Sequence, residues 1–164
     1  MSQIFKRRLV RERVLQALYA FELNKEGLQA LTDALLADID DKSDHEFGEA
    51  LINRTLIHEK EIDKLIMSRV DNWEMNRIAL LDKLLLRMGL CELIYFPDIP
   101  PKVSINECIE IGKIYSTAGS GKFINGILDA LLGELIESGS LDKSGRGLVE
   151  ESILKPLKKK LDEK

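Results

Sequence analysis

Apolar residues recur along this chain at the three- and four-residue spacing of amphipathic helices. One such stripe, near the C-terminal end, is formed by Ile124, Ile127, Leu128, Leu131 and Leu135. No long stretch alternates with the two-residue period of a strand. The spacing predicts six helical segments, at residues 6–24, 28–39, 44–70, 77–95, 103–116 and 121–138. We therefore expect an all-α fold.

Segment 77–95 differs from the others because apolar residues surround it almost completely, so we expect it to be the central helix. The connections between segments are short, which favours one compact domain over residues 1–138. After this domain, three glycines and a lysine-rich end predict a flexible extension over residues 139–164 that closes with a short basic helix.

The amino-acid composition indicates how large a core the chain can bury and in which compartment the protein is expected. With 164 residues, 45% of them hydrophobic, the chain is long enough to bury a substantial core. Cys91 and Cys108 lie in apolar helical patterns without a CxxC motif, and we expect both to be buried, reduced thiols. No apolar run approaches the ~20 residues that span a bilayer, and the basic start lacks the features of a signal peptide. These features predict a cytoplasmic protein.

Charge is distributed unevenly. The net charge is −4, but residues 1–20 contain five basic residues and one acidic residue, so a basic end precedes an acidic body. Cations at a helix N-terminus oppose the helix macrodipole at a cost of a few tenths of a kcal/mol each. The basic cluster is therefore hard to explain as a stabilising feature, and it favours contact with an anionic partner.

The first segment presents two stripes on a helical wheel. The stripe that we expect to be buried contains Val10, Val14, Ala17, Leu18 and Phe21. The stripe that we expect to face solvent contains Arg8, Arg11, Leu15 and Tyr19. Guanidinium groups contact phosphates and stack on bases, and an aromatic ring is a platform for bases, so this combination suits single-stranded RNA. The alternative is an ordinary solvated basic face.

The stretch KFINGILD, residues 122–129, places a ring beside an ammonium group at a helix start. Phe123 lies off the apolar stripe, and Gly126 leaves an open surface beside it. The preceding GSGKF is not a phosphate-binding loop, since Ser116 and Phe123 occupy the positions of its first glycine and its hydroxyl residue. We expect Ser120 to be the N-cap of this helix. The alternative role for the ring is packing against the preceding loop.

The sequence contains no convincing site for metal, cofactor or catalysis. His45 and His58 have no partners at metal-ligand spacing, and we expect both to be solvated. Glu59, Glu61 and Asp63 are predicted to lie on an exposed face. No nucleophile, base and orienting group form a recognisable set. We therefore predict that the protein has no metal or cofactor and is not an enzyme.

Three stretches together carry a family resemblance: RRLVRERVLQALYAFEL at 7–23, WEMNRIALLDKLLLRMGLCEL at 73–93, and the region 99–129, which includes IPPKVSINECIEIGKIYS and GKFINGILD. They resemble the NusB family over about residues 6–135. The resemblance implies an all-α, compact bundle of about six to seven helices in two packed helical subdomains, the second beginning after Trp73.

The same resemblance implies a function in transcription antitermination. Proteins of this kind pair with the ribosomal protein NusE and bind the single-stranded boxA element of nascent transcripts, chiefly ribosomal RNA. The bound pair joins the RNA polymerase antitermination complex and helps the polymerase resist termination.

The resemblance also assigns residues to these contacts. The positions that it assigns to RNA binding are Lys6, Arg7, Arg8, Arg11, Lys122 and Phe123, and those on the surface facing NusE are Tyr19 and Asp82. Asp82 interrupts the most apolar helix, where a carboxylate needs solvent, a partner or an internal donor. An ion pair with Arg87 is not expected, because positions i and i+5 do not share a helix face.

Two alternative functions remain open from the sequence. One is a protein-binding adaptor that uses Tyr19 and Asp82 without direct RNA contact. The other is a stand-alone RNA-binding module related to the N-terminal domain of ribosomal RNA cytosine methyltransferases, which would need a separate catalytic chain. The sequence also leaves open whether the protein is a monomer or a homodimer, and whether RNA binding requires NusE.

Overall fold

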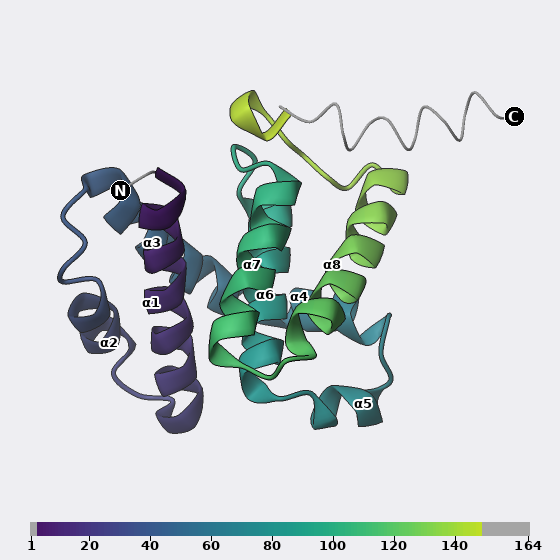
Figure 1. Ribbon diagram of the computed structural model, residues 1–164, viewed down its shortest axis with the longest axis horizontal. Helices are drawn as coiled ribbons and strands as arrows, with labels where there is room; N and C mark the ends of the chain where they lie inside the picture. The colour runs from purple at the N-terminus through teal and green to yellow at the C-terminus, as the bar shows by residue number, and fades with distance from the viewer. Residues whose placement is uncertain (1–2, 149–164) are drawn as a thin grey trace, which may run out of the picture.

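The computed structural model describes residues 3–148, apart from the side chains of residues 3, 4, 72 and 73. Within this range the chain forms eight α-helices and one short 3-10 helix, without strands, so the predicted all-α fold is confirmed (Figure 1). The elements are α1 (Gln3–Asn24), α2 (Leu28–Leu35), α3 (Lys42–Ile57), α4 (Glu59–Met67), α5 (Asn72–Arg77), α6 (Leu80–Tyr95), α7 (Pro101–Tyr115), α8 (Ser120–Glu137) and η1 (Gly145–Leu148).

The helices form two packed groups (Figure 1). Helix α1 packs on α2 and α3, while α6, α7 and α8 pack on one another. The groups meet where α1 and α3 contact α6 and where α1 contacts α7. Helix α4 precedes residue 73 but packs on α6 and α8, so it belongs with the second group.

Helix α6 is the centre of the molecule, as its apolar sequence predicts. Every residue from Leu84 to Leu93 is buried, and the helix contacts α1, α3, α4, α7 and α8. Gly89 permits the closest of these approaches. A Cβ atom there would lie 2.8 Å from the Leu128 side chain and 3.3 Å from the sulfur of Cys108. The absent side chain therefore lets α7 and α8 pack tightly against α6.

Two of the predicted segments are divided in the structure, and α5 lies mostly in a stretch that was predicted to be a connection. The segment expected at 44–70 is two helices, α3 and α4, that meet at His58. The backbone hydrogen bonds continue through this residue, which explains why the apolar period shows no break. The His58 ring stacks on Tyr95, with 3.7 Å between ring centroids, so this histidine has a packing role although its side chain is still 30% exposed. The start of segment 77–95 is likewise divided, because α5 ends at Arg77 and α6 begins at Leu80.

Residues 139–148 lie against the end of α6. The Lys143 ammonium group donates to the backbone oxygens of Glu92 (3.1 Å) and Phe96 (2.9 Å). The Ser144 amide donates to the Pro97 carbonyl at 2.9 Å. The sequence did not predict this attachment. The basic stretch that we expect to form a short helix lies at 149–164, outside the described residues.

Neither Cys91 nor Cys108 forms a disulfide, and both are completely buried, as predicted. Burial in the apolar core raises the pKa of Cys91 to about 12, and burial raises the pKa of Cys108 as well. Both thiols are therefore protonated and unreactive in the folded protein. Over residues 3–148, no helix is both long and apolar enough to cross a membrane.

We expect the folded protein at pH 8 to react with a disulfide-exchange reagent far more slowly than the same protein in urea. The raised pKa of the thiols also makes the stability of the fold depend on pH. Below about pH 8.5 the thiols are protonated in both the folded and the unfolded state, and stability is at its full value. Above that pH only the unfolded thiols lose their protons, so the free energy of unfolding falls as the pH rises toward 12. Release of the reagent's chromophore measures the rate. Equal rates in the presence and absence of urea would show that the thiols are not buried.

Candidate nucleic-acid interface

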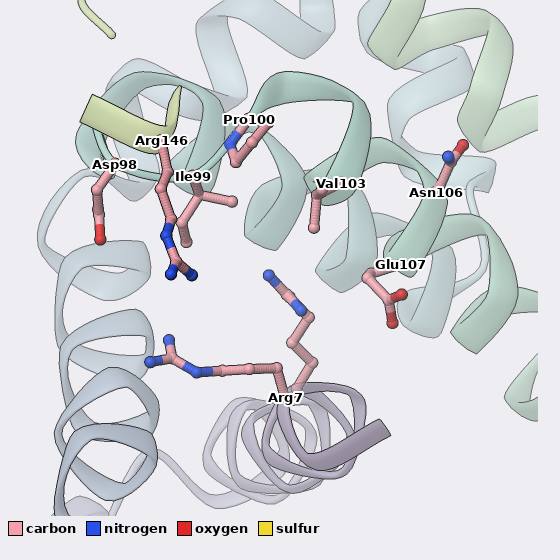
Figure 2. Close-up of a pocket in the computed structure, with 9 residues that line it drawn as sticks. Arg7, Asp98, Ile99, Pro100, Val103, Asn106, Glu107 and Arg146 are labelled. Carbon is pink, nitrogen blue, oxygen red and sulfur yellow. The ribbon is translucent and has the colours of Figure 1, made fainter. Parts of the chain in front are cut away.

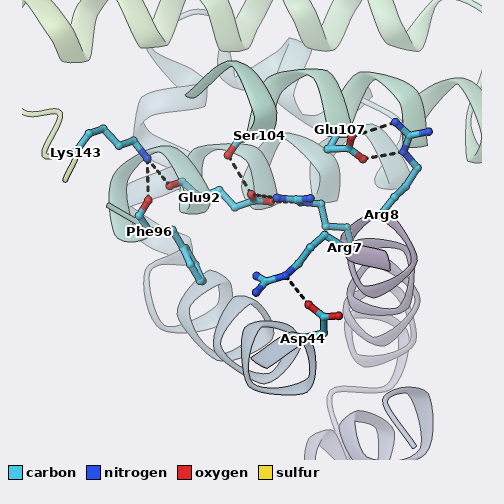
Figure 3. A network of polar contacts seen from close by, with 9 residues as sticks. Arg7, Arg8, Asp44, Glu92, Phe96, Ser104, Glu107 and Lys143 are labelled. Carbon is cyan, nitrogen blue, oxygen red and sulfur yellow. Dashed lines mark hydrogen bonds and ion pairs between the residues drawn. The ribbon is translucent and has the colours of Figure 1, made fainter. Parts of the chain in front are cut away.

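The four arginines of α1 form ion pairs with four different parts of the fold, and Figure 3 shows those of Arg7 and Arg8. Arg7 pairs with Asp44 at the start of α3 (2.7 Å), and Arg8 pairs with Glu107 of α7 (2.7 Å). The remaining pairs are Arg11 with Glu92 of α6 and Arg13 with Asp38 after α2. The arginines of the basic cluster therefore all have acidic partners inside the protein. The macrodipole argument could not anticipate these partners, because the carboxylates come from segments distant in the sequence.

Arg11 is the innermost of these residues, with a side chain only 3% exposed. Its Nε and a terminal nitrogen donate to the two Glu92 carboxylate oxygens at 2.9 and 2.7 Å. The Ser104 hydroxyl donates to the same carboxylate at 3.0 Å. Burial acts to lower the pKa of Arg11, but the adjacent Glu92 charge and its hydrogen bonds leave that pKa raised overall. Both carboxylate oxygens of Glu92 thus have donors inside the protein.

The prediction that Arg11 and Leu15 face solvent is wrong, because both are buried. Helix α1 packs against α2, α3, α6 and α7, so its buried face is wider than the single stripe of a surface helix. Phe21, which was predicted to lie in the buried stripe, is only half-buried. Tyr19 is 40% exposed, as predicted.

Arg7 and Arg8 keep part of their surface in solvent, with side chains 25% and 24% exposed. The Arg7 guanidinium lies over the Phe47 ring, 4.3 Å from its centroid. Arg8 donates twice to Glu107, at 2.7 and 3.0 Å, and this hydrogen bonding raises the pKa of Arg8. Each guanidinium is thus held in one orientation while part of it can still contact a ligand.

Phe5 is an aromatic residue that was not among the residues predicted to bind RNA. Its ring is 55% exposed, and the Arg8 guanidinium lies 5.5 Å from the ring centroid. Lys6, beside it, is also exposed. The signal was present in the sequence as a ring directly before the basic run. Together, Phe5, Lys6, Arg7 and Arg8 form what we call the basic end of α1.

The second predicted RNA group lies at the start of α8. Lys122 is exposed, whereas Phe123 is half-buried and packs on the core. No atom would lie within 4 Å of a Cβ at Gly126, so the predicted open surface is present on this helix. Phe123 also lines a cavity of about 490 Å³ together with Val70, Ile78 and Asp82. The ring therefore has one face toward the protein and one toward a hollow in the surface.

Ser120 is not the N-cap that we predicted, because α8 already begins at this residue. Its hydroxyl is turned inward, where it accepts from the Thr117 amide at 3.1 Å and donates to Asp82 at 3.0 Å. Asp82 is buried, and its second carboxylate oxygen has no hydrogen-bond partner within residues 3–148. Of the three possibilities that the sequence allowed for Asp82, which were solvent, a partner or an internal donor, the structure shows an internal donor, the Ser120 hydroxyl.

Arg87 does not pair with Asp82, as the spacing predicts. It donates to both Asp63 oxygens at 2.8 and 2.9 Å and pairs with Glu59 at 3.0 Å. Glu59 and Asp63, which we expected on an exposed face, are therefore half-buried and form ion pairs with a buried arginine. The contact spans two helices, α4 and α6, and the period of α4 alone could not reveal it.

The predicted RNA residues do not form one continuous cluster. Arg8 meets α7 near the middle of that helix, at Glu107, whereas Lys122 lies beyond the C-terminal end of α7 (Figure 1). The structure instead brings Phe123, predicted to contact RNA, beside Asp82, predicted to contact a protein. Among the residues described, no group of three His, Cys, Asp or Glu side chains is arranged to hold a metal ion.

Comparison with solved structures defines the class of protein. A chain of NusB from T. maritima aligns with a TM-score of 0.73 at 37% identity, over 78% of this chain and 91% of that one. A chain in the crystal structure of antitermination factors NusB and NusE in complex with dsRNA aligns with a TM-score of 0.70, over 82% of this chain and 99% of that one. Its 24% identity supports the fold alone. The fold is that of a helical antitermination factor.

Sequence comparison then identifies the family. Transcription antitermination protein NusB of Chloroherpeton thalassium is 45% identical over 149 residues, which cover 90% of this chain and 71% of that protein. Its counterpart from Salinibacter ruber is 46% identical over 145 residues, covering 87% and 91%. Residues 8–132 match the model of the NusB family. The chain belongs to the NusB family of transcription antitermination factors.

We expect Arg11→Ala to lower the free energy of unfolding by roughly 3–5 kcal/mol, because it leaves the buried Glu92 carboxylate without its partner. Arg13→Ala is the matched control, since it removes an arginine from the same helix whose ion pair is exposed, and it should cost at most about 1 kcal/mol. Urea unfolding followed by circular dichroism measures both. Equal losses for the two variants would contradict the structural importance of the buried pair.

Proposed function

We propose that this protein acts in transcription antitermination by binding the single-stranded boxA element of nascent ribosomal RNA transcripts in the cytoplasm, together with NusE. The observation that carries the proposal is the basic end of α1, where two guanidinium groups are fixed by internal carboxylates and remain partly exposed beside an exposed ring. A positioned guanidinium loses little conformational freedom when it binds a phosphate or stacks on a base. Family membership supports the proposal.

The two groups of residues receive different roles in this proposal. Arg7 and Arg8, with Lys6, contact RNA phosphates and bases at the basic end. Arg11 orients α1 from within, since its side chain is only 3% exposed and pairs with Glu92. Lys122 and Phe123 contact a further part of the same RNA, with Phe123 as the stacking platform.

Tyr19 and Asp82 are proposed to contact NusE, which would bring the protein and its RNA to RNA polymerase. Tyr19 offers an exposed ring, and Asp82 lines a cavity open to a partner side chain. One of the solved structures with this fold contains NusB and NusE in complex with dsRNA, which supports a partnership of this type. Because Phe123 lines the same cavity as Asp82, RNA and NusE would meet there.

A second candidate function is a protein-binding adaptor without direct RNA contact. It is favoured by the internal pairing of Arg7, Arg8, Arg11 and Arg13, since each of these cations already has an acidic partner. RNA phosphates would have to add to these contacts or compete with them. Salt separates the two functions. Direct contacts between arginines and RNA phosphates weaken as the salt concentration rises, whereas an adaptor without such contacts shows no salt-dependent RNA binding of its own.

The test is binding of boxA RNA and of a scrambled RNA, with and without purified NusE, at several salt concentrations. We expect Arg7→Ala/Arg8→Ala to weaken boxA binding and to lower the salt slope by about 0.7 for each phosphate that is no longer neutralised. Phe123→Ala should cost about 1–3 kcal/mol, the value of one stacked base.

Arg13→Ala is the control for the loss of an ion-paired α1 arginine outside the basic end, and it should leave boxA binding unchanged. If the wild-type protein binds NusE but neither RNA, the adaptor function is correct. Equal affinity for boxA and scrambled RNA would contradict sequence-specific recognition.

A further inference from the structure

The described part of the C-terminal extension, residues 139–148, lies outside the region that matches the family model. The Lys143 ammonium group accounts for much of its attachment, because it binds two backbone oxygens at the end of α6 (Figure 3). A cation at this position also interacts favourably with the helix macrodipole. Leu141 packs on the core, and Ser144 donates to Pro97. Several independent contacts thus fix the path of this segment.

Two glycines are required for this path. A Cβ at position 147 would lie 2.0 Å from the Pro97 carbonyl oxygen, closer than any side chain tolerates. Gly145 has a φ of +54°, in the left-handed region that favours glycine. The residue between them, Arg146, is therefore presented at a defined place instead of on a freely moving tail.

Arg146 lies at the mouth of a cavity of about 340 Å³ that also borders the basic end of α1 (Figure 2). Arg7 and Arg146 extend their guanidinium groups toward the same space from opposite sides. Ile99, Pro100 and Val103 form an apolar wall, and Asn106 adds an amide group. The volume lies within the range of small-ligand sites.

The charges in this cavity are only partly balanced by internal ion pairs. Arg7 and Arg11 have acidic partners, and Glu107 is held by Arg8. Arg146 is exposed and makes no ion pair with any residue in the range 3–148. Asp98, also exposed, adds one acidic group to the lining. This combination of three arginines, two carboxylates of which Glu107 is already paired, and an apolar wall suits a ligand that has an anionic group, a flat apolar face and hydrogen-bond donors.

We propose that this cavity binds one nucleotide of the RNA, with the base against the wall of Ile99, Pro100 and Val103 and the phosphate on Arg146. The inference rests on the proposed function and extends it, because it gives the C-terminal segment a direct part in RNA recognition. Guanidinium groups both stack on bases and bind phosphates, so Arg7 and Arg146 can hold the nucleotide from two sides. Arg146 is then a binding residue, and Lys143 and Gly147 are positioning residues.

The test compares RNA affinity and its salt slope for four variants of the full chain. Arg146→Ala should weaken binding at least about fivefold, the low end for removal of one stacking partner, and lower the salt slope by about 0.7. Arg146→Lys should keep the slope but lose affinity, because an ammonium group does not stack or bind in a fork. Gly147→Ala should reproduce the effect of Arg146→Ala without a change of charge, since it displaces the segment from Pro97.

Lys60→Ala is the matched control, because it removes an exposed cation from α4, a helix that contributes no residue to the cavity. It should leave affinity and slope unchanged. Urea unfolding checks that each variant is folded. In a parallel NMR titration, uridine or adenosine monophosphate should shift the signals of Ile99, Val103 and Arg146, and inorganic phosphate should not shift those of Ile99 and Val103.

Four outcomes would overturn the inference. If Arg146→Ala binds RNA like the wild type while Arg7→Ala/Arg8→Ala does not, the proposed function stands and this cavity has no part in it. If phosphate alone gives the same shifts as the nucleotides, the cavity is an anion site. If Arg146→Ala weakens NusE binding and leaves RNA binding intact, the cavity serves a protein partner. Absence of RNA binding by the wild type would overturn the proposed function as well.

Discussion

The buried ion pair between Arg11 and Glu92 is the contact on which the arrangement of the helices depends. It joins the N-terminal helix to the central helix α6, and the Ser104 hydroxyl extends it to α7. A buried guanidinium is tolerable only with its carboxylate in place, so a shift of α1 along α6 would leave two uncompensated charges. We therefore interpret the pair as the device that fixes the position of α1, while the large apolar core supplies most of the stability.

Once α1 is fixed, its other arginines fall opposite their own carboxylates. Arg7 reaches the start of α3 and Arg8 reaches α7, each with an edge left in solvent. Glu92 also links the two ends of the described chain (Figure 3). Its side chain binds Arg11 from α1, and its backbone oxygen accepts from Lys143 of the C-terminal segment. Helix α1 and the C-terminal segment are thus both attached to this residue of α6, and Arg7 and Arg146 line one cavity.

Local periodicity in the sequence was enough to predict most of the helical segments, although not the division at His58 or helix α5, and also the central position of α6 and the two buried cysteines. These predictions were correct because each depends on apolar spacing within one segment. The partners of charged residues were not predictable in this way. The carboxylate that pairs with Arg8 is 99 positions away, and the one that pairs with Arg11 is 81 positions away.

The candidate site shows the same limit of prediction from sequence. Spacing correctly excluded an ion pair between Asp82 and Arg87, but it could not identify Ser120 as the donor to Asp82. The exposed ring of Phe5 was visible in the sequence, whereas the position of Arg146 required the backbone approach at Gly147. Residue types at the proposed RNA surface were thus readable in advance. The internal partners that hold Arg7 and Arg8 beside the exposed ring of Phe5 were not.

The most direct test of this positioning is the ratio of boxA to scrambled RNA affinity for Glu107→Gln. This change removes the carboxylate that orients Arg8, and it also removes one negative charge next to the proposed RNA surface. If the internal ion pairs position α1 for specific recognition, the ratio should fall although affinity for scrambled RNA rises. If both affinities rise together and the ratio is unchanged, the basic residues act through charge alone and the central claim is wrong.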